Sequence, residues 1–221
     1  MLSYIYMKIL ESQPERYDRG ITWLSFGHSI IMKRRIAEQI KPGSRVLEIG
    51  IGTATLALLM AQQGADILGF DVSAPMLAVA RKKIVAAGMA DKIQLREMGV
   101  TGMDKLPAGS FDMIVSTLVF SELSKDEQLY ALRQAQRVLK ENGILVIADE
   151  TRPKRRFKRF LYSLIRLPLL LFTFILTQTT TKAVEGLEEQ VREVGFRITQ
   201  CQLSNWDSFI YLVARKESVT P

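Results

Sequence analysis

The chain has 221 residues, of which 48% are hydrophobic and 24% charged, a balance typical of a folded globular protein rather than a disordered chain. A single cysteine, Cys201, excludes an internal disulfide framework. With only one histidine, His28, the chain cannot build a zinc site of the usual His/Cys type, so we expect no bound metal. The first residues lack the basic-then-apolar layout of a secretory signal, and we therefore expect a cytoplasmic protein.

The net charge of +7 comes almost entirely from one segment. The stretch RPKRRFKR, residues 152–159, holds six lysines and arginines and no acid, and the rest of the chain is close to neutral. The apolar run 167–177 that follows is shorter than the ~20 residues of a spanning helix. For 152–178 we favour a hydrophobic lid over a substrate. Peripheral contact with anionic lipid at the inner membrane face and a homodimer face remain open, and nucleic acid is disfavoured.

Short apolar, β-branched runs alternate with helical stretches, the pattern of parallel strands with helices on both faces of a sheet. Strands are predicted over 45–49, 66–71, 93–98, 113–117 and 144–149. Helices are predicted between them over 53–63, 74–87 and 125–141. A further helix over 184–194 precedes two strands, 197–203 and 209–214, that form a closing hairpin. The sequence therefore predicts one α/β domain.

The sharpest motif is VLEIGIGTAT, which begins at Val46. Gly50 and Gly52 follow a buried strand at once and precede a helix, where glycines permit a sharp turn and the close approach of a ligand. Asp71 ends the next strand, nineteen residues after Gly52. A carboxylate at that point can accept hydrogen bonds from both ribose hydroxyls of an adenosyl cofactor.

Two details of this motif separate S-adenosylmethionine (SAM) from a dinucleotide. Glu48, directly before the turn, would repel a pyrophosphate, whereas it suits the cationic methionyl end of SAM. The third glycine of the dinucleotide fingerprint is Thr55 here. The motif thus favours SAM over NAD(P), and an NAD(P)-linked reductase is a minor alternative.

Four segments resemble, in order and spacing, the nucleotide-binding motifs of class I SAM-dependent methyltransferases: VLEIGIGTAT, GFDVS, FDMIVSTLVFSEL and LKENGILVIADE. The resemblance implies a Rossmann-like, three-layer α/β sandwich with a seven-stranded, mostly parallel sheet of order 3-2-1-4-5-7-6. It also implies four regions: an N-terminal helical lid over 1–40, a SAM-binding core over 41–150, a helical insertion between strands 5 and 6 over 151–182, and a closing helix and strands over 183–221.

The flanks of the core carry a narrower resemblance. YMKILESQPERYDRGI and LTQTTTKAVEGLEEQVREVGF are similar to the corrinoid-protein-associated methyltransferases of anaerobes, which implies a corrinoid-protein partner.

The class I resemblance also implies which residues contact the cofactor, from its methionyl end through the ribose to the adenine. These are Tyr17, Glu48, Gly50, Gly52, Thr53, Asp71, Val72, Met76, Gly99, Val100 and Ser116. Two positions depart from the family pattern. Ala54 replaces the third glycine, and Gly99 replaces the acid that commonly bonds the adenine amine, which leaves that role to backbone groups or to Asp104.

The implied reaction transfers the methyl group of SAM to an acceptor and releases S-adenosylhomocysteine. The acceptor is open between a hydrophobic small molecule, such as a quinone or lipid, and a protein or corrinoid-system partner. If it loses a proton, the candidate bases are Glu122, Asp149, Glu150 and His28. For Asp149 and Glu150 an ion pair with the basic stretch is an equal alternative, and His28 is favoured as a helix residue. A non-catalytic SAM-binding or membrane-recruited module is the rival function.

Overall fold

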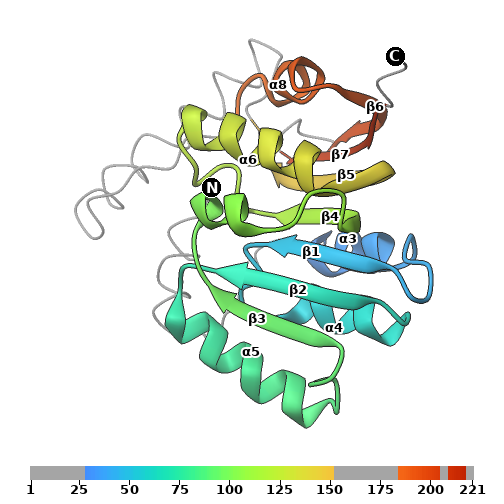
Figure 1. Ribbon diagram of the computed structural model, residues 1–221, viewed down its shortest axis with the longest axis vertical. Helices are drawn as coiled ribbons and strands as arrows, with labels where there is room; N and C mark the ends of the chain where they lie inside the picture. The colour runs from blue at the N-terminus through green and yellow to red at the C-terminus, as the bar shows by residue number, and fades with distance from the viewer. Residues whose placement is uncertain (1–27, 152–183, 205–208, 218–221) are drawn as a thin grey trace.

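A computed structural model of the protein describes residues 28–151, 184–204 and 209–217 (Figure 1). In chain order its helices are α3 His28–Ala37, α4 Thr55–Gln62, α5 Ala74–Ala86, the short 3-10 helix η1 Val100–Lys105, α6 Lys125–Val138 and α8 Leu187–Glu193. Its strands are β1 Arg45–Ile49, β2 Asp66–Asp71, β3 Ile93–Glu97, β4 Phe111–Thr117, β5 Leu139–Glu150, β6 Phe196–Leu203 and β7 Phe209–Lys216.

The seven strands form one sheet in the order β3-β2-β1-β4-β5-β7-β6. Strands β1 to β5 pair in parallel, and β7 runs antiparallel between β5 and β6. The fold class and the strand order predicted from the sequence are therefore confirmed. In such a sheet the carboxyl ends of β1 to β5 meet at one edge, where ligands of open α/β folds bind.

Helices cover both faces of the sheet, which makes three layers (Figure 1). Side chains alternate between the two faces along β1: Val46 packs in the cluster that includes α3, α4 and α5, and Leu47 packs in the cluster that includes α6 and α8. The described part of the predicted N-terminal lid is α3, and its Ile36 is fully buried in the first cluster. That portion of 1–40 thus contributes to the core.

Several predicted boundaries differ by one to three residues from the observed ones, and the largest difference lies where α6 passes into β5. The helix predicted to reach residue 141 ends at Val138, and β5 begins at Leu139. The carbonyls of Arg137 and Val138 accept hydrogen bonds from the N–H groups of Gly109 and Ser110, just before β4. These bonds draw the chain into the sheet, where Leu139 pairs with Phe111, because a long-range partner outweighs local helix propensity.

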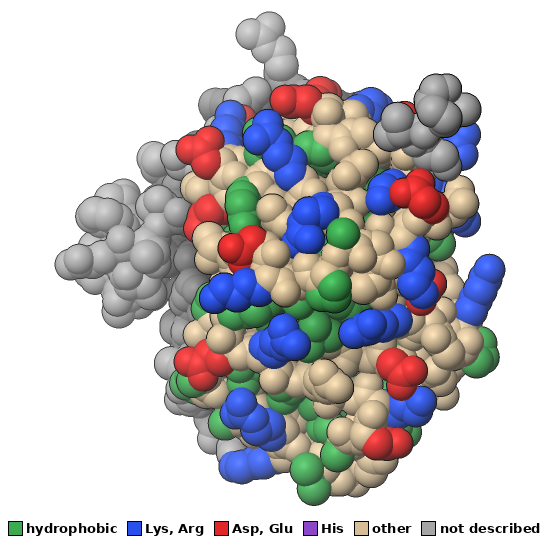
Figure 2. Space-filling view, viewed as in Figure 1, with side chains coloured by type: hydrophobic (Ala, Val, Ile, Leu, Met, Phe, Trp, Pro, Cys, Tyr) green, Lys and Arg blue, Asp and Glu red, His purple; other side chains and the backbone are tan. Residues whose placement is uncertain are grey.

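Chain segments on either side of 152–183 meet at the carboxyl edge. Thr151 and Val184 form a parallel bridge, the Thr151 hydroxyl donates to the Val184 carbonyl at 3.0 Å, and the Val184 N–H donates to the Glu150 carbonyl at 3.1 Å. Most of the predicted insertion 151–182, with its lid, membrane and dimer interpretations, lies outside the described residues. Within the part that the structure covers, no helix is long and apolar enough to cross a bilayer. On the face in Figure 2, Asp and Glu side chains lie between the Lys and Arg side chains, so this face carries both signs of charge.

Candidate active site

The turn between β1 and α4 opens the carboxyl edge of the sheet. Gly50 and Gly52 both have positive φ, 70° and 53°, a conformation that glycine adopts without strain. A Cβ added to Gly52 would meet nothing within 4 Å, whereas one on Gly50 would lie 2.2 Å from Val119 Cγ2. Gly52 therefore borders open space that a ligand can fill, and Gly50 is covered by the chain segment that follows β4.

Asp71 ties this turn to the end of β2. One carboxylate oxygen accepts the Gly52 N–H at 2.9 Å, and the other accepts the Ser73 N–H at 2.9 Å. Ser73 in turn caps α5 by accepting a hydrogen bond from the Met76 N–H. The acid predicted to hold the ribose is thus fixed in place by two backbone groups of neighbouring turns.

Glu48, at the end of β1, is 1% exposed, and its Oε2 lacks a hydrogen-bond partner among the described residues. Burial raises the pKa of Glu48 from 4.5 to about 8; the charge of Lys33 acts in the opposite direction, and that of Asp71 adds to the rise. A buried carboxyl with an unpartnered oxygen beside a glycine turn is well suited to a cationic ligand. The methionyl end of SAM carries such a charge, so the residues present fit this cofactor.

Ser116 is a second buried polar side chain whose hydroxyl lacks a hydrogen-bond partner among the described residues. It is fully buried near the end of β4, where it pairs with Ile49, and Glu48 pairs with Val115. Because facing residues of a parallel pair share a face, Glu48 and Ser116 lie on opposite faces of the sheet. The Glu48 carboxyl and the Ser116 hydroxyl therefore lie on either side of the sheet near its carboxyl edge.

Beyond the ribose position, the predicted adenine contacts split into exposed and buried groups. Val72 is 73% exposed, and its Cγ1 lies 3.5 Å from the point where a Cβ on Gly99 would stand. Met76 and Val100 are buried, and Val100 belongs to the core cluster under α6. Val72 and Gly99 together form an accessible apolar ledge of the kind that an adenine ring covers.

Thr53 and Ala54 lead into α4, and both are buried. Ala54 has a left-handed φ of 60°, which explains in backbone terms why the family pattern has a glycine there. Lys83 of α5 donates to the hydroxyls of Thr53 at 3.4 Å and Thr55 at 2.7 Å, and so links the two helices beside the turn. Sequence reasoning missed this lysine, because its reach across thirty residues leaves no local pattern.

The candidate bases occupy different environments. Asp149 is fully buried at the end of β5, where its carboxylate accepts backbone N–H groups. Glu150 is half-buried and follows it, whereas Glu122 is exposed after β4. His28 is the first residue of α3, and Tyr17 lies outside the described residues. Asp104, the alternative adenine contact, is exposed in η1.

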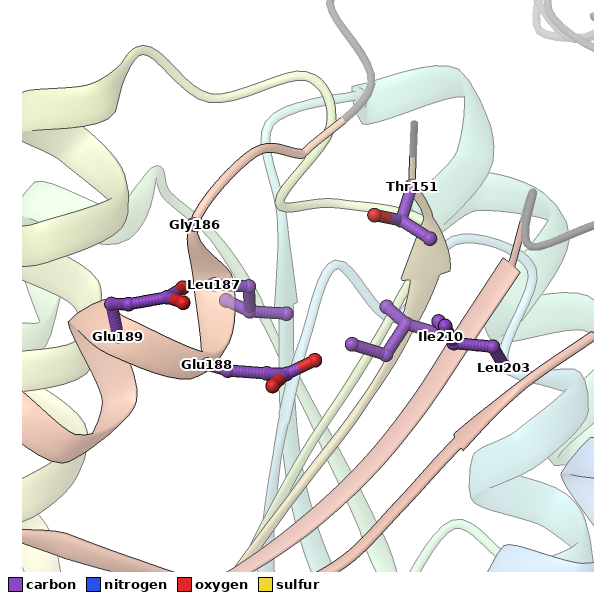
Figure 3. A pocket seen from close by; sticks show the side chains of 7 residues that line it. All are labelled: Thr151, Gly186, Leu187, Glu188, Glu189, Leu203 and Ile210. Carbon is purple, nitrogen blue, oxygen red and sulfur yellow. The ribbon is translucent and has the colours of Figure 1, made fainter. Parts of the chain in front are cut away.

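A hollow of about 200 Å³, lined by both aliphatic and polar side chains, lies farther along the same edge (Figure 3). It is bounded by the end of β5, the start of α8 and the facing ends of β6 and β7. Its lining consists of Thr151, Gly186, Leu187, Glu188, Glu189, Leu203 and Ile210. Leu187 and Ile210 are buried, and Leu203 is 37% exposed, so the hollow presents aliphatic carbon near the carboxylates of α8.

Comparison with known proteins points to a methyltransferase domain. Residues 46–143 match the family described as a methyltransferase domain. A demethylmenaquinone methyltransferase of Thermus thermophilus is 32% identical over 144 residues, which cover 63% of this chain and 63% of that protein. One from Tropheryma whipplei is 29% identical over 207 residues, 90% of this chain and 83% of the relative.

The fold itself recurs in a solved O-methyltransferase family protein from Burkholderia thailandensis. That structure has a TM-score of 0.70 at 15% identity, with 96% of this chain and 63% of the other covered. The match to a methyltransferase domain and the named methyltransferase relatives confirm the predicted enzyme class and the predicted cofactor, SAM. The protein is a SAM-dependent methyltransferase of the class I, Rossmann-like type, and residues 46–143 form its methyltransferase domain.

Proposed function

We propose that the protein methylates a ring carbon of a hydrophobic acceptor of the quinone class. The observation that carries the acceptor class is the hollow beside the end of β5 (Figure 3), where Leu187, Leu203 and Ile210 supply aliphatic walls next to the polar groups of Thr151 and Glu188. Two relatives that match much of the chain are named as demethylmenaquinone methyltransferases, which supports the same class.

When bound, SAM supplies an electrophilic methyl group on a sulfonium that leaves readily. The acceptor ring must therefore be electron-rich, as in a hydroquinone. The ring carbon forms the new bond, the electron pair of the broken bond stays on sulfur, and the ring proton goes to a base. Glu150 is half-buried at the end of β5 and directly precedes Thr151, which lines the hollow, and it is our candidate for that base. The chain itself orients the two reactants and excludes water.

A labelled-methyl assay tests this function. The purified protein is incubated with SAM carrying a trideuterated methyl group and a short-chain demethylated quinone, reduced before use. We expect a product with one trideuterated methyl group on a ring carbon, identified by mass spectrometry. Asp71→Asn should lower SAM affinity at least tenfold, because a charged hydrogen-bond acceptor is lost.

Asp66→Asn is the matched control. Asp66 begins the same strand at the opposite edge of the sheet, where it pairs with Lys92 at 2.9 Å on the surface, so its loss should leave SAM affinity unchanged. Methyl transfer to a reduced corrinoid but not to the quinol would replace this proposal with the corrinoid alternative. SAM binding without transfer to either acceptor would favour a non-catalytic module.

A further inference from the structure

The loop between β4 and α6 is held from β5 by one buried carboxylate. Asp149 Oδ2 accepts the N–H of Phe120 at 2.7 Å and that of Ser121 at 3.3 Å, and Oδ1 accepts the N–H of Glu150 at 2.7 Å. The side chain of Asp149 is fully buried. Hydrogen bonds from N–H groups to an ionised carboxylate are roughly twice as strong as neutral ones, so these bonds hold the loop most strongly when Asp149 is ionised.

A second buried side chain holds the same loop from the opposite side. Gln128 of α6 donates its amide to the Phe120 carbonyl at 2.7 Å and to the Leu123 carbonyl at 3.2 Å. Both backbone polar groups of Phe120 are therefore bound by side chains, while its ring is 1% exposed in the core. The loop thus has one defined position, although Leu118 at its start adopts a left-handed φ of 61°.

One residue of the β4–α6 loop, residues 118–124, contacts the glycine turn of the cofactor site. We call the hydrogen bonds from this loop to the Asp149 carboxylate the Asp149 clamp. Val119 lies between Leu118 and Phe120, and its Cγ2 occupies the space directly over Gly50, 2.2 Å from where a Cβ would stand. Any displacement of Phe120 and Ser121 would move Val119 away from this turn. The contact connects β5 to the methionyl side of the SAM site, across β4.

We infer that Asp149 is a positioning residue for SAM binding: its carboxylate fixes the β4–α6 loop so that Val119 packs over Gly50 and holds the glycine turn in its binding conformation. This role needs only the bound cofactor and is independent of the acceptor. It also differs from a role as a general base, because both carboxylate oxygens of Asp149 accept backbone N–H groups.

The inference carries a pH dependence. Burial raises the pKa of Asp149 from 3.8 to about 6, while hydrogen bonds from Ser121 and Glu150 oppose the rise. The charged neighbour is Glu150 on the same strand, which raises the pKa further. The other elements contribute uncharged groups: the Ser121 hydroxyl from the loop, Gln128 from α6 and Ile210 opposite on β7. Above pH 6 the Asp149 carboxylate is mostly ionised, and below pH 6 its protonation weakens the hydrogen bonds that it accepts from Phe120 and Ser121.

The test compares Asp149→Asn with Asp112→Asn. Asp112 likewise accepts a backbone N–H from a neighbouring strand, that of Arg45 at 2.9 Å, but at the amino edge of the sheet. At pH 7.5 we expect Asp149→Asn to weaken SAM binding at least fivefold and to speed amide hydrogen exchange in 118–123 at least tenfold. Asp112→Asn should change neither quantity.

The second readout is the SAM dissociation constant of Asp149→Asn divided by that of wild type. If Asp149 only stabilised the fold, this ratio would not depend on pH. The ratio should fall toward one at pH 5, where most of wild-type Asp149 is also neutral; Glu48 titrates in both proteins, so its effect largely cancels from the ratio. A ratio of one at pH 7.5, or the same elevated ratio at both pH values, overturns the inference.

If Asp149→Asn does not fold, Val119→Ala keeps the proposal open to refutation. This change leaves the Asp149 clamp intact and removes the contact with Gly50. SAM affinity should fall severalfold while loop exchange stays as in wild type. An unchanged affinity would show that the loop does not act through Val119.

Discussion

The carboxyl ends of β1 and β5 each hold a buried acid, and the two acids differ in their partners. Among the described residues, one oxygen of Glu48 on β1 lacks a hydrogen-bond partner, whereas both oxygens of Asp149 on β5 accept backbone N–H groups. Their pKa values follow, about 8 for Glu48 and about 6 for Asp149, chiefly because burial penalises the charged forms while hydrogen bonds hold that of Asp149 lower. Glu48 thus keeps an acceptor oxygen that a ligand can bind, whereas the carboxylate of Asp149 is already engaged in hydrogen bonds that hold the fold.

The largest expected effect tests Glu48 through the pH dependence of stability. The pKa of Glu48 is about 8 in the folded protein and 4.5 in the unfolded chain. Its contribution to the free energy of unfolding is therefore intact below pH 4.5 and is lost as the pH rises toward 8. At about 1.4 kcal/mol per pKa unit, the ligand-free protein loses on the order of 5 kcal/mol relative to Glu48→Gln. Urea unfolding of both proteins from pH 5 to pH 9 measures this difference. A difference that does not change with pH would mean that Glu48 is ionised without ligand.

Asp149 should show a smaller effect in a narrower window. Its folded pKa of about 6 against 3.8 predicts that the free energy of unfolding of wild type falls by on the order of 3 kcal/mol relative to Asp149→Asn as the pH rises from 4 to 6. Above pH 6 the difference should stay constant. Denaturation midpoints at half-unit pH steps separate this window from that of Glu48, and a slope that continues to pH 8 would contradict the assignment.

The contact between Val119 and Gly50, which joins the β4–α6 loop to the glycine turn, leaves no room for a larger residue at position 50. Gly50→Ala places a Cβ against Val119 at a φ of 70°, whereas Gly43→Ala imposes the same kind of backbone strain at a φ of 78° with nothing within 4 Å. We expect Gly50→Ala to destabilise the protein by about 2 kcal/mol more than Gly43→Ala, measured by thermal unfolding. Combination with Asp149→Asn should reduce the excess, because the released loop can move aside; equal penalties for the two alanines would show that Val119 yields freely.

The smallest effect is expected at the amino edge. Asp112 has a lowered pKa: despite the cost of burial, hydrogen bonds from Lys140 and Arg45 hold it down, so its contribution is present at neutral pH and lost in acid. The pair with Lys140 at 2.8 Å is exposed to solvent, and its removal by Lys140→Met should cost less than about 1 kcal/mol at pH 7. A loss above 2 kcal/mol would place this surface pair on a par with the buried acids.

Much of the fold follows from local sequence signals. Strands β1 and β2 begin and end where the apolar runs do, and α6 starts at the Ser124–Glu127 capping box. The end of α6 could not be predicted, because the bonds from Gly109 and Ser110 that stop it come from residues distant along the chain.

The candidate site divides in the same way. Glu48, Gly50, Gly52 and Asp71 form a compact motif with fixed spacing, so the sequence predicts them together. Val119 and Gln128 act through contacts that only the folded chain creates, and no spacing rule indicates them. The partners of Asp149 likewise required the loop to be seen in place.

The bridge between Thr151 and Val184 has a consequence for how this part of the chain can be exchanged. Its two strands of chain stand side by side, so the intervening stretch is anchored at adjacent points on a finished sheet. Closing a loop between adjacent ends costs little more when the loop is long than when it is short. The bridge therefore fixes the two points at which the chain leaves and rejoins the described sheet, so chimaeras cut at 151 and 184 would keep both ends of the exchanged stretch at the same place.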